Sequence, residues 1–190
     1  MRGVAGGSDQ RRRRGENEIV LRTQYRDGHE IEECYIAGDF GVDRKTMQIT
    51  RESATIRPGD WCDQGYPFYA GSLVYRRQVR LNPRAGEQYR LRIGNHFAAC
   101  VAVRINGKLA RVLGWAPYEA DVTRLLRAGN NVVELELCGS PRNLLGPNHL
   151  VERWPPWTGP GQFIDLDRWT DEYNLQPYGL FGKVTMAVQR

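Results

Sequence analysis

Aromatic side chains in two long loops are the residues of this sequence best suited to binding chemistry. The loops span residues 57–71 and 139–179 and are rich in Trp, Tyr, Pro and Gly. Sugars present C–H faces that stack on aromatic rings, while their hydroxyl groups need directional polar partners. We therefore predict a sugar-binding site drawn from these loops and one further tryptophan: Trp61, Tyr66, Tyr69, Trp115, Arg142, Asn143, His149, Trp154 and Trp157.

The same aromatic residues also have a purely structural interpretation. Long loops can fold back over a domain and bury their rings as a lid on its core. This is the commoner role for any single tryptophan in such a loop. The binding prediction therefore requires only that at least one ring of the set faces a ligand.

Residues suited to acid–base catalysis are present but are not organised into a catalytic motif. A catalytic His149 would need a partner within hydrogen-bond reach, and the sequence identifies none, so we favour a structural hydrogen bond. Asp39, Asp60 and Asp63 could supply a carboxylate pair for glycoside hydrolysis, but each lies beside glycine or in a turn, where aspartate is common for backbone reasons. Nucleophile-elbow, P-loop, H-E-x-x-H and dinucleotide motifs are absent. We therefore predict no catalytic residues and no cofactor, although loop aspartates permit a structural Ca²⁺.

The elements that must position these loops are predicted to be strands. Residues 132–137 alternate Val133, Leu135 and Leu137 with charged side chains, and residues 129–131 form a tight turn before them. Asn106-Gly107 is a type I′ hairpin signal. About nine such strands and no convincing helix beyond a turn or two predict an all-β fold, an antiparallel β-sandwich with long aromatic-rich loops. The expected strands are 19–25, 31–37, 72–81, 88–93, 98–105, 108–113, 118–122, 132–137 and 180–188.

The net charge of +5 comes mainly from the N-terminus. Residues 1–15 hold five arginines and one aspartate, so they contribute four of the five positive charges. We expect this segment to be a disordered Gly/Arg-rich leader and residues 16–190 to form a single sandwich domain. Nucleic acid is therefore an unlikely partner, because no basic patch continues beyond residue 15.

Two further features bear on the setting of the chain. No apolar run approaches the roughly 20 residues needed to span a bilayer, and the N-terminus lacks the apolar core of a signal peptide. We expect no membrane partner, and a secreted or periplasmic parent protein would carry its signal upstream. The four cysteines, Cys34, Cys62, Cys100 and Cys138, have no metal-type spacing. Their spacing leaves disulfides open, and free thiols are the default expectation.

Several phrases of the sequence resemble a galactose-binding-like jelly-roll module. Such modules occur at the C-terminal ends of large bacterial glycoside hydrolases, including α-L-rhamnosidase-like and family 2-like enzymes. The resemblance spans about residues 16–190 and implies a jelly-roll fold and an accessory role beside a catalytic domain. The phrases that carry it are I-E-E-C-Y-I-A-G-D-F-G-V (31–42), D-W-C-D-Q-G-Y-P-F-Y-A-G-S-L-V-Y (60–75), W-A-P-Y-E-A-D-V-T (115–123), A-G-N-N-V-V-E-L-E-L (128–137) and N-L-L-G-P-N-H (143–149).

The sequence thus favours a non-catalytic carbohydrate-binding module of a glycoside hydrolase, with carbohydrate and a catalytic domain of a larger parent protein as its partners. One alternative is a purely structural accessory sandwich that packs against that catalytic domain. A second alternative is a small stand-alone polysaccharide lyase or hydrolase. An exposed apolar patch would favour the first alternative, and a pocket with two carboxyl groups would favour the second.

Overall fold

The computed structural model describes residues 35–152, 159–163 and 166–189, with isolated positions 18, 20, 22, 24, 26 and 27. The chain divides into two compact units, residues 1–37 and 38–190, and the second holds the elements discussed below. The predicted leader, most of the predicted strands 19–25 and 31–37, and Cys34, Trp154 and Trp157 lie outside the described residues.

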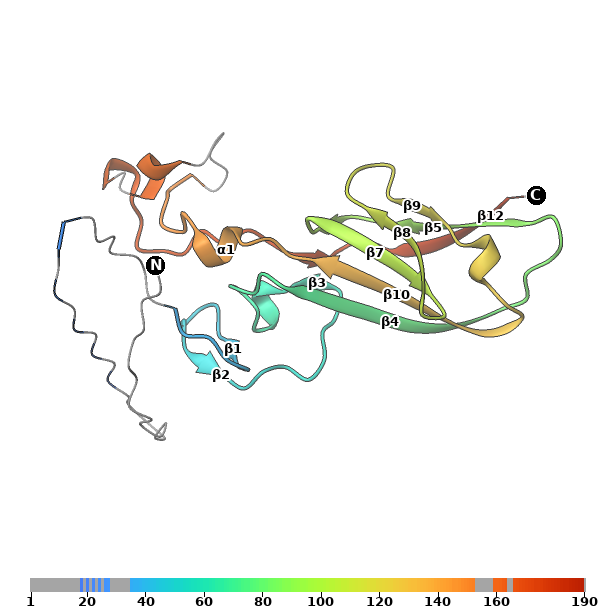
Figure 1. Ribbon diagram of the computed structural model, residues 1–190, viewed down its shortest axis with the longest axis horizontal. Helices are drawn as coiled ribbons and strands as arrows, with labels where there is room; N and C mark the ends of the chain where they lie inside the picture. The colour runs from blue at the N-terminus through green and yellow to red at the C-terminus, as the bar shows by residue number, and fades with distance from the viewer. Residues whose placement is uncertain are drawn as a thin grey trace. The chain divides into compact units, whose positions relative to one another are not determined.

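One sheet of four antiparallel strands contains β4 (Ser72–Leu81), β10 (Gly129–Cys138), β7 (Cys100–Ile105) and β8 (Lys108–Leu113), in the order β4-β10-β7-β8 (Figure 1). In its register Leu135 lies between Tyr75 of β4 and Val103 of β7. Because strand side chains alternate between faces, Val133, Leu135 and Leu137 are all buried on one side of β10. The alternation read from the sequence is therefore confirmed here.

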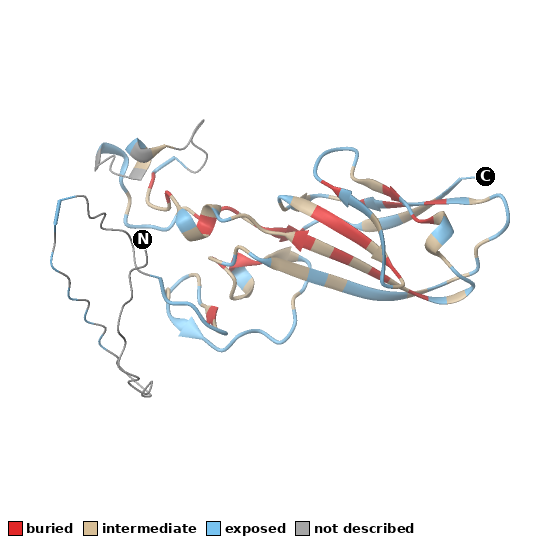
Figure 2. Ribbon diagram, in the orientation of Figure 1, coloured by how far each residue is buried: buried red, intermediate tan, exposed pale blue. Residues whose placement is uncertain are grey.

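A second antiparallel sheet faces the first and contains β12 (Val184–Gln189), β5 (Gln88–Ile93) and β9 (Glu119–Asp121), in the order β12-β5-β9. Its central strand buries Tyr89, Leu91 and Ile93 in strict alternation. These side chains share one hydrophobic core with those of β10 and β7, and Figure 2 shows the buried residues along these strands. The predicted all-β antiparallel sandwich is confirmed.

Short elements connect the two sheets to the loops. β1 (Gly41–Val42) pairs with β2 (Ile49–Thr50), and β3 (Gly59–Asp60), β11 (Gly179–Leu180) and β6 (His96–Phe97) form a small sheet in the order β3-β11-β6. A Cβ at position 179 would collide with the carbonyl oxygen of Gly59, so this strand crossing requires glycine. Helical structure in the described residues is limited to single turns: η1 (Cys62–Gln64), η2 (Thr123–Leu125), α1 (Arg142–Leu145), η3 (Pro160–Phe163) and η4 (Leu166–Arg168).

Two turn predictions have different outcomes. Asn106 and Gly107 both have positive φ, as the predicted type I′ hairpin between β7 and β8 requires. The turn predicted at residues 129–131 is wrong in position, because β10 already begins at Gly129. The buried Asn131 side chain explains the difference, since its amide donates to the carbonyl oxygens of Arg127 and Gly129 and closes the reversal ahead of the strand.

No helix among the described residues has the length and hydrophobicity to cross a membrane.

Candidate functional site

Trp61 occupies the core and not a binding surface in this structure. Its side chain is fully buried, and its Nε1 donates a hydrogen bond to the hydroxyl of Tyr75 at 2.8 Å. Its ring lies 6.3 Å from that of Tyr178, and its backbone N–H donates to the carbonyl oxygen of Tyr178 at 2.7 Å. The ring thus ties the loop after β3 to the sandwich and offers no face to a ligand.

Asn143, at the start of α1, is a buried link between three segments. Its Nδ2 donates to the carbonyl oxygens of Pro67 at 3.0 Å and Gln176 at 2.8 Å, and its Oδ1 accepts from the Gln176 backbone N–H at 2.8 Å. The thiol of Cys62 lies beside this link, 3.4 Å from the Gln176 carbonyl oxygen. Burial, followed by the charge of Asp60, raises the pKa of Cys62 to about 12, so this thiol remains protonated at neutral pH.

His149 lies at the centre of an aromatic cluster on the loop that follows β10. Its ring stacks on Trp169, with centroids 4.6 Å apart and an interplanar angle of 17°, and lies 4.4 Å from the ring of Tyr173. Tyr173 also contacts Phe68 edge-on at 5.5 Å. We call Phe68, His149, Trp169 and Tyr173 the aromatic stack. Trp169 is 46% exposed and Tyr173 is 41% exposed, so solvent reaches two of its rings.

Backbone hydrogen bonds between two chain segments hold the aromatic stack in place. The backbone N–H of Thr170 donates to the carbonyl oxygen of His149 at 2.9 Å, and that of Asn174 donates to the carbonyl oxygen of Asn148 at 2.7 Å. Leu150 and Trp169 form an isolated antiparallel bridge between them. The predicted structural hydrogen bond of the histidine is present, since its Nδ1 lies 3.0 Å from the Thr170 carbonyl oxygen.

Two polar side chains, Arg142 and Asp171, lie near the aromatic stack. Arg142 donates through Nη1 to Oδ1 of Asn148 at 3.1 Å, and its buried Nη2 has no partner among the described residues. Burial lowers the pKa of Arg142. On the exposed side, Nε1 of Trp169 donates to the carboxylate of Asp171 at 3.3 Å. The structure therefore brings Arg142 and His149 into one region, together with the buried Asn143.

The remaining predicted binding residues lie elsewhere. Tyr66 and Tyr69 form an edge-on pair, with centroids 5.7 Å apart, on the loop that also carries Phe68, and Tyr69 is 39% exposed. Trp115 is 82% exposed on the connection between β8 and β9, and Figure 1 shows that connection well separated from α1. Trp154 and Trp157 lie outside the described residues.

The loop aspartates brace the backbone. Asp60 and Asp63 both contact Nη1 of Arg44, at 3.4 Å and 2.9 Å, and Asp60 also accepts hydrogen bonds from the backbone N–H groups of Cys62 and Tyr178. Asp39 is exposed in a bend. Within the described part of the chain, no group of three or more His, Cys, Asp or Glu side chains is placed to hold a metal ion. The cysteines described there, Cys62, Cys100 and Cys138, are free thiols as expected.

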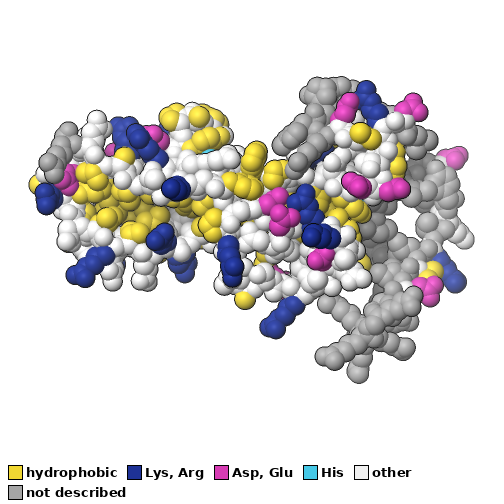
Figure 3. Space-filling view, turned by 180° about the vertical axis from the view of Figure 1, so that it is seen from behind, with side chains coloured by type: hydrophobic (Ala, Val, Ile, Leu, Met, Phe, Trp, Pro, Cys, Tyr) yellow, Lys and Arg dark blue, Asp and Glu magenta, His cyan; other side chains and the backbone are white. Residues whose placement is uncertain are grey.

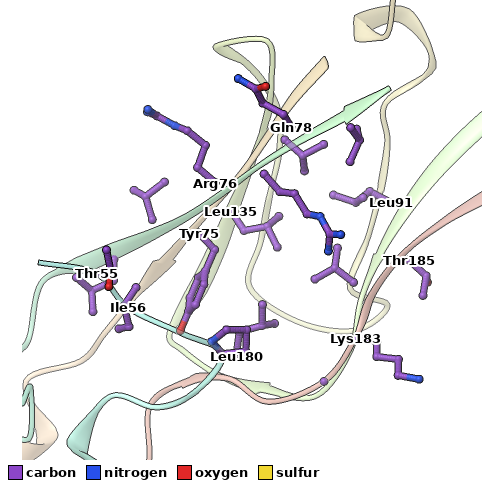
Figure 4. Close-up of a pocket in the computed structure, with 18 of the residues that line it drawn as sticks. Thr55, Ile56, Tyr75, Arg76, Gln78, Leu91, Leu135, Leu180, Lys183 and Thr185 are labelled. Atoms are coloured by element: carbon purple, nitrogen blue, oxygen red, sulfur yellow. The ribbon is translucent and has the colours of Figure 1, made fainter. Parts of the chain in front are cut away.

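An open groove on one side of the sandwich was not predicted from the sequence. It has a volume of 1540 Å³ and lies between β4 of one sheet and β12 of the other. Figure 4 shows Tyr75, Leu91, Leu135 and Leu180 around this space, while Arg76 and Gln78 project to the other side of β4. From behind, hydrophobic side chains form a band across the sandwich with Lys and Arg side chains beside it (Figure 3). One feature of the sequence could have indicated the groove. In the predicted strand 72–81, Arg77 stands on the otherwise apolar inner side, and a charged residue there indicates that this side is not fully covered.

The aromatic stack was predicted only in part. Trp169, Tyr173 and Phe68 belong to the two aromatic loops, but their contacts with His149 join segments far apart in the sequence. Spacing along the chain carries no information about such pairings.

Comparisons with known proteins give partial structural likenesses. The structure of a rhamnosidase from Novosphingobium sp. PP1Y is 23% identical, with a TM-score of 0.48, and the match covers 64% of this chain and 11% of that one. The Bifidobacterium dentium β-glucuronidase complexed with coumarin-3-O-glucuronide is 22% identical (TM-score 0.45, 69% of this chain and 24% of that one). A Faecalibacterium prausnitzii β-glucuronidase is 21% identical (TM-score 0.42, 69% and 25%).

No family profile and no curated protein sequence matches the chain. The chain spans at most a quarter of the length of the three solved structures named above. At these TM-scores the likenesses have no weight in assigning a function.

Proposed function

We propose that the chain is a non-catalytic carbohydrate-binding module that accompanies a glycoside hydrolase. The observation that carries this proposal is the aromatic stack, in which His149 backs the half-exposed ring of Trp169 with Tyr173 beside it. Binding sites for sugars combine such ring faces with a few polar groups of fixed orientation. The sequence phrases that resemble galactose-binding-like modules support the same setting.

In this mechanism a sugar ring places its C–H face against Trp169 or Tyr173. The stacked imidazole of His149 holds the indole in position, so little side-chain freedom is lost when a sugar binds. Asp171 lies at the Nε1 edge of the indole and accepts hydrogen bonds from sugar hydroxyl groups. A shallow site with one or two stacking rings gains little net free energy, so we expect a dissociation constant in the range of about 0.1 to 1 mM.

Calorimetric titration of the chain with a panel of plant and bacterial oligosaccharides tests this proposal. We expect at least one sugar to bind, and Trp169→Ala to weaken that binding by about tenfold or more. Phe97→Ala is the matched control, because it removes a partly exposed ring that belongs neither to the aromatic stack nor to the predicted binding residues. The proposal fails if no sugar of the panel binds, or if Trp169→Ala binds as tightly as the unmodified chain.

A structural accessory role is the second candidate, and the open groove between β4 and β12 favours it. Large apolar surfaces that are exposed on an isolated domain are commonly interaction sites. A module that packs against a catalytic domain through this groove need not bind sugar at all. Loss of sugar binding would therefore leave this second function standing.

A further inference from the structure

The groove between β4 and β12 is an opening into the core of the sandwich. Its floor includes Leu91, Leu135 and Leu180, whose side chains are at most 5% exposed, together with the partly buried Tyr75 and Met186 (Figure 4). Its volume of 1540 Å³ exceeds the about 300–1,000 Å³ that is typical of small-molecule sites. An occupant of polymer size fits this space better than a single small ligand does.

Both walls of the groove are edge strands of their sheets as far as the described residues go. In the part of the chain that the structure describes, β4 pairs only with β10 and β12 pairs only with β5. Each strand therefore presents backbone N–H and C=O groups to an incoming extended segment, as in β-strand addition. The ten residues of β4 give this edge a length of about 34 Å.

The charges of the groove are of one sign. Arg77 lies opposite Val133 in the β4–β10 register, so it is on the core-facing side of β4, in line with Leu73 and Tyr75. Lys183 lies at the rim of the opposite wall just before β12, and its exposed side chain points away from Leu91 and Leu135 (Figure 4). Neither cation forms an ion pair with a described residue, whereas Arg76, on the outer side of β4, pairs with Glu134 at 2.7 Å. None of the described residues that line the groove carries a carboxylate.

From these features we infer that the groove binds an extended strand of the accompanying catalytic domain, in which apolar residues alternate with carboxylates. The apolar side chains fill the opening over Leu91 and Leu135, and the carboxylates meet Arg77 inside the groove and Lys183 at its rim. Backbone groups of the strand pair with the free edge of β4 or β12. This inference rests on the accessory role proposed above and does not depend on sugar binding at the aromatic stack.

A competing explanation of Arg77 is protection of an open edge. Inward-pointing charges on edge strands are a known means of preventing edge-to-edge association. In that case Arg77 excludes partners and has no ligand. The two explanations differ in what reversal of the charge does, which makes them separable by experiment.

Fluorescence anisotropy of labelled synthetic peptides tests the inference with the full chain. The probe is a blocked peptide of about nine residues in which Glu alternates with Val, long enough to span most of β4. A Lys/Val peptide of the same length and a peptide of the same composition without alternation are the matched controls. We expect the Glu/Val peptide to bind at least tenfold more tightly than either control at about 50 mM salt, and less tightly at about 500 mM.

Variants locate the peptide on the groove. Arg77→Glu should weaken binding of the Glu/Val peptide at least about tenfold, and the double variant Arg77→Glu, Lys183→Glu should prefer the Lys/Val peptide. Arg111→Glu on β8 is the control, because this exposed arginine does not line the groove. Arg77→Gln removes the charge by a smaller change and serves if the reversed variant does not fold.

Three outcomes would overturn the inference. The first is equal or absent binding of the Glu/Val and Lys/Val peptides. The second is self-association of Arg77→Glu in sedimentation without peptide binding by the unmodified chain, which would assign edge protection to Arg77. The third is a groove filled by a second copy, seen as a dimer that the peptide does not dissociate. Sugar binding is measured separately, so a failure here leaves the carbohydrate-binding proposal intact.

Discussion

The sandwich and the loop region from residue 139 to 178 are stabilised in different ways. The sandwich buries alternating apolar side chains between two hydrogen-bonded sheets, with Val101, Val103 and Leu137 fully buried. The loop region has little ladder pairing in its described residues. Instead, the buried side chain of Asn143 donates to the carbonyl oxygens of Gln176 and, outside the region, of Pro67, and the half-buried side chain of Asn148 donates to that of Asn143. Regular strands satisfy their own backbone, whereas loops of this length need side chains to do so. The aromatic stack, which is the surface suited to sugar binding, therefore lies in the region that depends on side-chain hydrogen bonds and not on strand pairing.

The largest expected effects come from emptying fully buried sites, and the first of these sites is in the sandwich. Leu137→Ala removes a fully buried side chain that lies between Leu73 and Val101, and should lower the free energy of unfolding by about 2–5 kcal/mol. Chemical denaturation measures this change. Leu109→Ala on β8 is the control, since that leucine is 50% exposed and should cost much less. Equal losses in both variants would contradict the assignment of the core to β10.

In the loop region the residue whose replacement should cost the most stability is the polar Asn143. Asn143→Ala leaves the buried N–H of Gln176 and the carbonyl of Pro67 without this partner, and should cost about 1–3 kcal/mol. Hydrogen exchange should increase at residues 139–178 and remain unchanged in β7 and β10. The exposed Asn130→Ala is the matched control. Faster exchange throughout the sandwich would show that the two regions unfold as one unit.

The sequence predicts the sandwich far better than the site. Val133, Leu135 and Leu137 alternate because neighbouring strands impose a period of two, and this period can be read locally. Trp61 shows the limit, because a tryptophan in a Gly- and Pro-rich loop has the same local signature whether it faces a ligand or, as here, bonds Tyr75 inside the core. His149 and Trp169 are twenty positions apart in the sequence and meet only in the folded protein. Such contacts depend on the folded loop and not on the spacing of residues.

Ionisation of the buried Cys62 thiol should have a smaller effect on the free energy of unfolding, and this effect depends on pH. Cys62 lies where the two regions meet. Burial raises its pKa from 9.0 to about 12 in the folded protein. Below pH 9 both states keep the proton, but between pH 9 and 12 only the unfolded state loses it, so stability falls as the pH rises. The loss is about 1.4 kcal/mol per pH unit in this range.

Denaturation curves at several pH values test this prediction through a difference in slope. Cys62→Ala lacks the thiol, so its stability should fall less steeply above pH 9 than that of the unmodified chain, whatever its stability at neutral pH. Tyr66 and Tyr75, whose pKa values burial also raises, contribute equally in both proteins and cancel in the comparison. Parallel slopes would mean that the thiol is solvated and that Asn143 and Gln176 do not enclose it.

The smallest expected change in stability is that of an exposed tryptophan, which is compared with the change for a buried one. Trp115 is 82% exposed, so Trp115→Ala should change the free energy of unfolding by no more than about 0.5 kcal/mol. Trp61→Ala, by contrast, empties a fully buried site and should cost about 3–5 kcal/mol in the same denaturation assay. A large loss for Trp115→Ala would place that ring in a packed environment, against its exposure in the structure. A small loss leaves Trp115 as an exposed aromatic surface outside the loop region, and its contribution to sugar binding can then be measured without a change in stability.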